Sequence, residues 1–198
     1  DAEALESLHP LDPYPVEPSK AGPPTVVVTP AGAADSDAAA PRGGVLLHSR
    51  YQPLAEAERL LKDVDVESHF VFYVHGLGLG YHVEQLFERA SSEAVVCVFE
   101  PDLNVLRLAV ESRDLSALIS SRRVIFFTRP DKAEMLTRLT RHSAMITMGT
   151  GSLVHPPSEQ LHKQFHDQVR AWLGEFASYF QTSLNTLVLN GRRTAENI

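Results

Sequence analysis

The feature that most constrains the fold of this chain is an apolar run, Val71–Val74, that ends in three alternating glycines. The glycines are Gly76, Gly78 and Gly80. After them, apolar residues recur at helical spacing. Glycine permits positive φ and a close approach of backbone to a ligand, and a helix N-terminus offers unpaired N–H groups. The stretch therefore predicts a strand, a phosphate-binding turn and a helix.

Polar residues beside this turn are the first candidates for ligand contacts. His75 precedes the first glycine, and Tyr81 and His82 follow the last one. Histidine titrates near neutral pH and can act as an acid, a base or a donor to phosphate. The alternative is that both histidines are hydrogen-bonded parts of the scaffold.

A second apolar run, 94–99, ends in Glu100 and is followed by Asp102. A carboxylate at the end of the second strand is where a Rossmann-like fold binds ribose hydroxyls. Glu100 is therefore a candidate for ribose binding, with an exposed acid or a helix cap as the alternative. Asp102 is expected mainly as the N-cap of the next helix, and it stays in the candidate binding set.

Strand-like and helical segments alternate through the middle of the chain. Strands are expected over residues 69–74, 94–99, 123–128 and 144–148, and helices begin near Pro53, after the glycine turn, at Asp102 and at Asp131. This alternation predicts an α/β fold, a Rossmann-like (methyltransferase-like) three-layer sandwich with a mostly parallel sheet.

The two ends differ from this pattern. Residues 1–44 are expected to form an arm rich in Pro and acidic residues and a small β-hairpin, with antiparallel strands over 25–29 and 44–48. The Rossmann-like domain covers 45–157. Residues 158–198 carry apolar residues three or four apart, which predicts one long helix, or two joined near Gly174. That helix either lies along the sheet or connects to a following domain or a second copy of the chain.

Composition excludes some classes of function. The 198 residues carry a net charge of −7, which argues against a nucleic-acid partner, because phosphate binding needs clustered Lys and Arg. No apolar run approaches the ~20 residues of a membrane span, so no membrane partner is expected. The single cysteine, Cys97, lies mid-strand and is expected to be buried and reduced, which fits a cytoplasmic location.

Two ligand templates fit the glycine turn incompletely. A dinucleotide site requires glycine where Tyr81 stands, and an S-adenosylmethionine site requires an acidic residue where Val74 stands. A nucleotide or nucleotide sugar is therefore favoured over S-adenosylmethionine, and a plain tight turn stays open. No nucleophile motif and no P-loop lysine is present, so no catalytic residue is assigned. His155, His162 and His166 have spacing typical of metal ligands but no clear acidic partner, so no metal is expected.

The segment Ser49, Arg50 and Tyr51 lies between the second strand of the hairpin and the Pro53 helix. Arg50 could donate two hydrogen bonds to a phosphate or carboxylate. The alternative is a surface loop in which Tyr51 packs as an anchor.

Two phrases resemble a known family. The stretch 48–59, His-Ser-Arg-Tyr-Gln-Pro-Leu-Ala-Glu-Ala-Glu-Arg, followed by the glycine turn and by Phe-Glu-Pro-Asp at 99–102, resembles the N-terminal domain of the motility accessory factor (Maf-like) glycosyltransferases. The phrase at 48–59 is the more specific part. The resemblance extends from about Val45 to the C-terminus, including the phrase at 190–197.

The resemblance implies a bacterial, multidomain protein in which nonulosonic sugars pass from nucleotide-activated donors to Ser or Thr of flagellin. It implies that the transferase centre lies in a following domain, whose Gly-rich phrase this chain does not contain. The implied partners are that domain and a flagellin-like acceptor, and the long helix suggests a homo-oligomer. The expected function is thus a non-catalytic domain that binds a nucleotide, organises the protein or oligomerises. A methyltransferase-like enzyme and a purely structural interaction domain are the alternatives.

Overall fold

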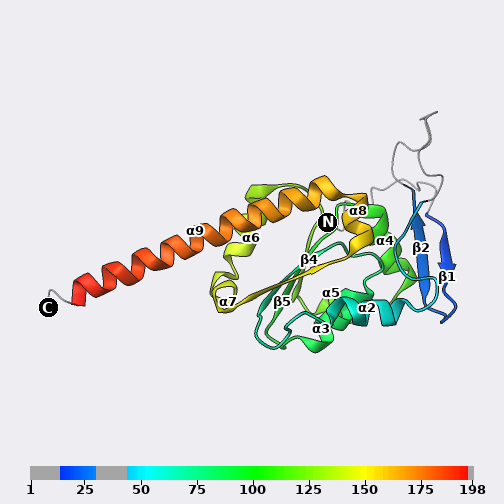
Figure 1. Ribbon diagram of the computed structural model, residues 1–198, viewed down its shortest axis with the longest axis horizontal. Helices are drawn as coiled ribbons and strands as arrows, with labels where there is room; N and C mark the ends of the chain where they lie inside the picture. The colour runs from blue at the N-terminus through cyan, green and yellow to red at the C-terminus, as the bar shows by residue number, and fades with distance from the viewer. Residues whose placement is uncertain (1–13, 30–43, 196–198) are drawn as a thin grey trace.

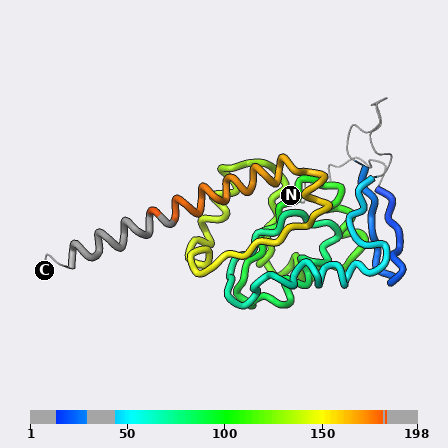
Figure 2. Tube along the Cα trace, viewed as in Figure 1, coloured from blue at the N-terminus to red at the C-terminus, as the bar shows by residue number. Residues whose placement is uncertain are grey.

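The computed structural model describes residues 14–29 and 44–195 (Figures 1 and 2). It is an α/β fold in which helices flank a four-stranded sheet, with a separate three-stranded sheet near the N-terminus and a long helix at the C-terminus. The predicted fold class is therefore confirmed. The expectations for the arm at residues 1–13, for the loop at 31–43 and for the end of the phrase at 190–197 lie outside the described residues.

The four-stranded sheet is parallel throughout, in the order β6-β5-β4-β7. Its strands are β4 (Val71–His75), β5 (Val95–Phe99), β6 (Val124–Phe127) and β7 (Thr150–Val154). The chain moves outward from β4 through β5 to β6 and then crosses back to place β7 on the other side of β4. This reversal creates a topological switch point between β4 and β7, where open α/β sheets bind their ligands.

Both faces of this sheet are buried. Alternate residues of β4 pack into two different apolar clusters: Phe72 and Val74 into one, Val71 and Tyr73 into the other. Cys97 of β5 lies in the second cluster as a free, fully buried thiol, as expected. Unbroken apolar strands are therefore required, because a residue pointing either way meets a layer of helices.

The helices divide between these two clusters. One face is covered by α2 (Pro53–Leu61), α3 (Tyr81–Arg89), α4 (Leu103–Ser112) and α5 (Ser116–Ser120). The other is covered by α6 (Lys132–Thr140), α7 (Ser143–Met148) and α9 (Lys163–Ala195). The predicted caps are confirmed: the Asp102 carboxylate accepts the N–H groups of Asn104 and Val105, and that of Asp131 accepts the N–H of Glu134.

The fourth strand was placed wrongly by the sequence pattern. Residues 144–148 belong to helix α7, and the strand follows at Thr150–Val154. Met145 and Ile146 pack together against the second cluster, which a helical turn allows. A glycine suits the strand instead, because a Cβ at Gly151 would lie 2.8 Å from the ring of Phe72. The prediction placed the strand on the apolar residues before Gly149, whereas the strand begins after Gly149 and contains Gly151.

The three-stranded sheet, here named the strap sheet, consists of β1 (Val16–Pro18), β2 (Pro24–Val28) and β3 (Val45–Leu46). Both neighbouring pairs are antiparallel, with Val27 opposite Leu46 in the second pair. The predicted hairpin is therefore confirmed, and β1 adds a strand that was expected to be part of the arm. The expected domain boundary at 44/45 separates β2 from β3, which pair with each other.

The C-terminal region begins with a short helix, α8 (Pro156–Leu161), before α9. α9 runs through Gly174 as a single helix, and its first part lies along one face of the sheet before the helix extends away from it (Figure 1). Val169 and Phe176 are buried there, with Trp172, Leu173 and Phe180 packed partly against the same cluster. At least this part of the helix therefore lies on the flank of its own domain.

Candidate functional site

The candidate site lies at the switch point, where β4 is followed by Gly76 and β7 by His155. The N–H of His155 donates to the carbonyl of His75 at 2.9 Å, which joins the two strand ends. A ligand of a Rossmann-like fold would lie in the crevice beyond these ends. The side chains found there decide what the site can bind.

The glycine turn itself is entirely buried, since every residue from Val74 to Val83 is in the interior. Its glycines have positive φ, 94° at Gly76, 51° at Gly78 and 84° at Gly80. A Cβ at Gly76 would lie 2.2 Å from that of Ser158, and one at Gly78 would lie 2.6 Å from Nε2 of His48. Close packing of the chain against itself therefore accounts for these two glycines.

The N–H groups of the turn are bonded inside the protein. Leu77 donates to Oε2 of Glu100 at 2.9 Å, and Leu79 donates to Nε2 of His48 at 2.8 Å. Gly76 donates to the carbonyl of Phe99, and Gly80 to that of Leu77. In this conformation a carboxylate and an imidazole of the chain occupy positions that a bound phosphate would take.

Glu100 is buried at the end of β5. Besides the N–H of Leu77, its carboxylate accepts the N–H of Asp102 at 3.1 Å. Burial raises the pKa of Glu100 to about 7, although these backbone donors act in the opposite direction. Glu100 therefore faces the glycine turn rather than solvent, and it holds the turn to β5.

Asp102 connects three elements as well as capping α4. Its carboxylate accepts the hydroxyl of Tyr14 at 2.9 Å and lies 3.9 Å from Nε2 of His162. The hydroxyl of Tyr14 is thereby desolvated beside an acid, which raises its pKa. Asp102 is thus an anchor for the segment that enters the strap sheet.

Three buried imidazoles, here named the histidine stack, fill the switch point: His48, His82 and His155. The ring of His155 lies 4.8 Å from that of His82, nearly parallel to it, and 4.8 Å from that of His48. Each ring comes from a different element: His48 follows β3, His82 lies in α3, and His155 follows β7. The stack therefore joins the strap sheet to the two strand ends.

Hydrogen bonds assign the proton positions in the stack. His48 must carry a lone pair on Nε2, because it accepts the N–H of Leu79. Nε2 of His155 faces the carbonyl of Leu47 at 2.9 Å, so it carries a hydrogen and leaves Nδ1 to accept the hydroxyl of Ser158 at 2.8 Å. Nε2 of His82 faces the carbonyl of Gly76 at 2.9 Å and likewise donates. All three rings fit the uncharged form.

Burial keeps the stack uncharged. It lowers the pKa of His82 to about 4 and the pKa values of His48 and His155 well below the usual range. Mutual repulsion between the rings adds to this effect, as does the guanidinium of Arg113 for His48 and His82. The stack therefore offers neither a proton donor of ordinary strength nor an accessible base at neutral pH.

A second histidine pair lies on the other side of β4. The rings of His75 and His166 are 5.5 Å apart and both are buried. Nδ1 of His75 and both ring nitrogens of His166 lack hydrogen-bond partners among the described residues. Burial lowers the pKa of each ring to about 4. Across residues 14–29 and 44–195, no three His, Cys, Asp or Glu side chains converge in a way that could hold a metal ion.

Tyr81 and Arg113 close the turn from the outside. The hydroxyl of Tyr81 donates to the carbonyl of Pro24 in the strap sheet at 2.8 Å. The guanidinium of Arg113 lies 4.0 Å from the ring centre of Tyr81, donates to the carbonyl of Leu79 and pairs with Glu84. Tyr81 therefore stands where a dinucleotide site has its third glycine, and its side chain bonds the strap sheet instead.

Ser49, Arg50 and Tyr51 do not join the glycine turn. The hydroxyl of Ser49 accepts the N–H groups of Tyr51 and Gln52, which shapes the loop before α2. Arg50 pairs with Glu17 at 3.5 Å, and Tyr51 is exposed with Lys20 over its ring. The loop thus lies at the surface and attaches to β1 and the turn after it, but Tyr51 is exposed rather than packed as the anchor that the alternative expected.

His48, His155 and Ser158 were not among the predicted site residues. His48 opens the phrase at 48–59, and His155 was weighed only as a metal ligand. A signal was present in the sequence, since His48 ends the predicted strand 44–48, and His155 and Ser158 flank a pair of prolines. Sequence spacing alone could not show that three rings from distant segments meet at one point.

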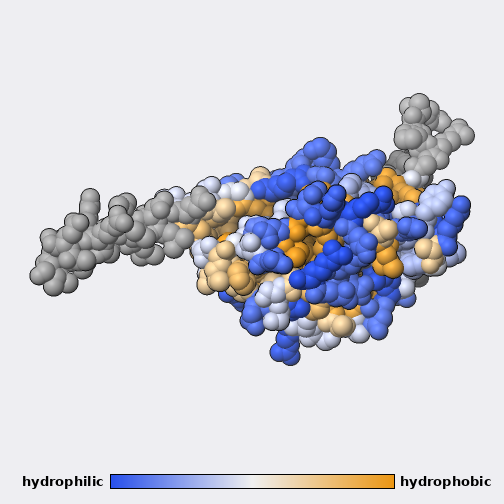
Figure 3. Space-filling model, turned by 60° about the horizontal axis from the view of Figure 1, so that its bottom comes forward, coloured by the Kyte–Doolittle hydropathy of each residue, from blue (hydrophilic) through white to orange (hydrophobic). Residues whose placement is uncertain are grey.

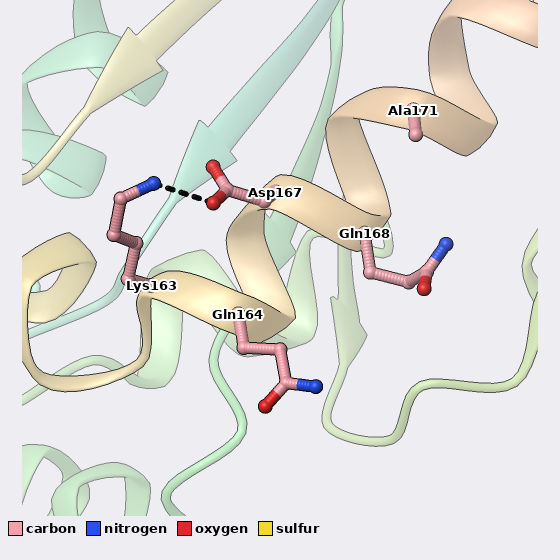
Figure 4. A pocket seen from close by; sticks show the side chains of 5 residues that line it. All are labelled: Lys163, Gln164, Asp167, Gln168 and Ala171. Atoms are coloured by element: carbon pink, nitrogen blue, oxygen red, sulfur yellow. Dashed lines mark hydrogen bonds and ion pairs between the residues drawn. The ribbon is translucent and has the colours of Figure 1, made fainter.

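A hollow of about 550 Å³ lies on α9 and is lined by Lys163, Gln164, Asp167, Gln168 and Ala171 (Figure 4). All five residues come from one helix, and Lys163 and Asp167 pair with each other. Figure 3 shows apolar residues in scattered areas on a mostly hydrophilic face. No polar groups from separate elements converge in this hollow.

Comparison with known proteins finds a relative that aligns over part of the chain. No protein-family model matches the chain. An uncharacterized protein of Treponema pallidum (strain Nichols) is 35% identical over 113 residues, which make up 54% of this chain and 38% of the relative. The aligned stretch is thus a minor part of that relative. None of the described helices has the length and apolar character needed to cross a membrane.

Proposed function

We propose that this chain is a non-catalytic, Rossmann-like accessory domain of a Maf-like glycosyltransferase, with an organising role. One observation carries the non-catalytic part: the switch point is filled by the histidine stack, and the amides of the glycine turn are bonded to Glu100 and His48. In this conformation the chain's own side chains thus lie where a Rossmann-like fold would hold a nucleotide. The resemblance at residues 48–59 and 99–102 supplies the family.

The organising role rests on the parts of the domain that reach outward. α9 has 33 residues, which corresponds to roughly 50 Å at 1.5 Å per residue. A helix of this length suits a connector to a following transferase domain or a contact between two copies. The relative, of which only 38% aligns, shows that related stretches occur with further sequence. By resemblance, transfer of a nonulosonic sugar to a flagellin-like acceptor then belongs to the following domain.

We infer that the protein is located in the cytoplasm. Nucleotide-activated sugar donors belong to the family's implied chemistry, and the single cysteine is a free thiol in the core. The net charge of −7 disfavours a nucleic-acid partner.

A thermal-shift panel tests the proposal directly. The isolated chain is heated with cytidine and uridine nucleotides, their nucleotide sugars, and S-adenosylmethionine. No ligand is expected to raise the melting temperature, whereas true binding at 100 times the dissociation constant would stabilise by about 2.7 kcal/mol, a shift of several degrees. A saturable shift with a nucleotide or nucleotide sugar would remove the non-binding part of the proposal, and one with S-adenosylmethionine would favour the methyltransferase alternative.

The organising part needs a longer protein that contains this domain. Glycosyl transfer by that protein is compared with transfer by its remainder after residues 1–198 are removed. We expect weaker acceptor glycosylation or loss of the oligomer without the domain, measured by mass spectrometry of the acceptor and by light scattering. Unchanged transfer and unchanged mass per particle would contradict an organising role.

A further inference from the structure

Val26 and Val28 of the strap sheet pack into the same apolar cluster as Phe72, and side-chain hydrogen bonds join the strap sheet to the carboxyl ends of the parallel strands. Tyr81, in the helix after β4, donates to Pro24 at 2.8 Å, and the imidazole of His155, after β7, donates to Leu47 at 2.9 Å. Asp102, after β5, accepts the hydroxyl of Tyr14. The strap sheet therefore covers the edge of the fold where the glycine turn lies.

The attachment of the strap sheet depends on the charge state of the His48 imidazole. Its carbonyl and N–H are both bonded to the hydroxyl of Thr25 in β2, at 2.6 and 3.2 Å, so the residue is fixed to the strap sheet. Its Nε2 accepts the N–H of Leu79 in the glycine turn. A protonated imidazole cannot accept that bond, and the N–H of Leu79 would then be left without its partner.

The surroundings of the stack also disfavour positive charge. His48 faces the rings of His82, His155 and Tyr81, and the guanidinium of Arg113 approaches from the segment after α4. Electrostatic repulsion from His166 of α9 further lowers the pKa of His155. Among the described residues, no carboxylate forms a hydrogen bond or ion pair with these three rings, and two acids of the same region, Glu84 and Glu100, are engaged by Arg113 and by backbone amides.

We propose that the histidine stack is an acid-sensitive latch: proton uptake by His48, His82 and His155 releases the strap sheet from the switch point while the parallel sheet stays folded. This inference is independent of the proposed function. The released state would expose the glycine turn and free the N–H of Leu79.

The sign of the pH dependence follows from linkage. The three imidazoles have lower pKa values when buried than the ordinary value of 6.5, so the open state takes up protons first as the pH falls. Closure is fully favoured above pH 6.5 and weakens below it, towards the pKa of about 4 of His82. Each proton taken up on opening weakens closure by up to about tenfold per pH unit.

Hydrogen exchange measured by mass spectrometry between pH 7.5 and pH 5 tests the latch. Protection factors, corrected for intrinsic exchange, are followed for peptides covering 24–28 and 45–49 of the strap sheet and 95–99 of β5. We expect protection of the strap peptides to fall at least tenfold from pH 6.5 to pH 5 while β5 stays protected. Strap protection that is independent of pH, or an equal fall in β5, would overturn the proposal.

His48→Gln separates protonation from packing. A glutamine amide oxygen can accept the N–H of Leu79 but does not titrate. The variant is expected to keep the strap protected at pH 7.5 and to lower the pH slope by about one proton per opening. His69→Gln is the matched control, because His69 is half-buried just before β4, at the opposite end of the strand from the stack, where its ring bonds the carbonyl of Asp65 and lies against Phe72. An unchanged slope in His48→Gln would show that His48 is not part of the latch, and the wild-type profile tests the remainder if this variant does not fold.

Discussion

The glycine turn and helix α9 differ in how they use their surfaces. Every residue of the turn from Val74 to Val83 is buried, and its amides are bonded to Glu100, His48 and backbone. On α9, by contrast, Val169 and Phe176 are buried while Gly174, Glu175 and Tyr179 face outward. A glycine turn whose sequence is typical of ligand binding can thus serve internal packing. The exposed surface lies instead on α9, whose sequence carries no binding motif.

Gly76→Ala should have the largest effect, because it adds a Cβ 2.2 Å from that of Ser158 at a residue with φ of 94°. We expect a loss of more than about 3 kcal/mol from overpacking and strain together, measured by urea denaturation. Gly22→Ala is the control: its φ is 101°, but nothing lies within 4 Å of the added atom. Backbone strain alone should cost about 1–2 kcal/mol there. Equal losses in the two variants would mean that the turn is not tightly packed.

Glu100→Gln tests whether burial of the ionised Glu100 carboxylate beside the glycine turn lowers the stability of the folded state. Its pKa is raised by burial from 4.5 to about 7, so the folded state binds a proton more strongly and wild-type stability falls as the pH rises from 4.5 to 7. The amide carries no such dependence. The variant should therefore gain about 2 kcal/mol relative to wild type between pH 5 and pH 8.

The measurement is the free energy of unfolding of both proteins at the two pH values. Taking the difference cancels the opposite dependence that the histidines contribute. A constant difference across this range would show that Glu100 is ionised without penalty, as an anion held by the turn amides would be.

Gly174→Ala should have the smallest effect and the opposite sign. Gly174 lies inside α9, and nothing is within 4 Å of an added Cβ. Alanine should stabilise the domain by about 0.5–1 kcal/mol through helix propensity, measured by the thermal midpoint. Ala171→Gly, at another exposed position of α9, should lower stability by a similar amount. A loss in Gly174→Ala would indicate that α9 needs flexibility or close contact at this point.

Much of the fold could be predicted because local patterns and global topology agree. The apolar strands 71–75 and 95–99, the caps at Asp102 and Asp131, and the long C-terminal helix each carry a signal within a few residues. β7 was misplaced because Ala144–Met148 is apolar and short enough to fit either type of element. Period alone cannot separate a short buried strand from a helical turn.

The site was predicted only in part, and the reason is long-range packing. The ring of His82 does bond the carbonyl of Gly76, and Glu100 bonds the N–H of the next residue, Leu77, as a Rossmann-like order of strands requires. What fills the space between them comes from residues 48 and 155, which are 107 positions apart and share no local pattern. Whether a glycine turn receives a ligand or the protein's own side chains depends on such distant segments.

The thiol of Cys97 has a practical consequence for all of these measurements. It is the single cysteine of the chain, it lies in the central strand β5, and burial raises its pKa to about 12. A thiol reagent therefore meets almost no thiolate while the sheet is closed. The rate at which the reagent labels the wild-type protein should therefore report opening of the parallel sheet, and no substitution is needed for this measurement. Release of the strap sheet alone should leave the labelling rate of Cys97 unchanged, whereas unfolding of the parallel sheet should raise it.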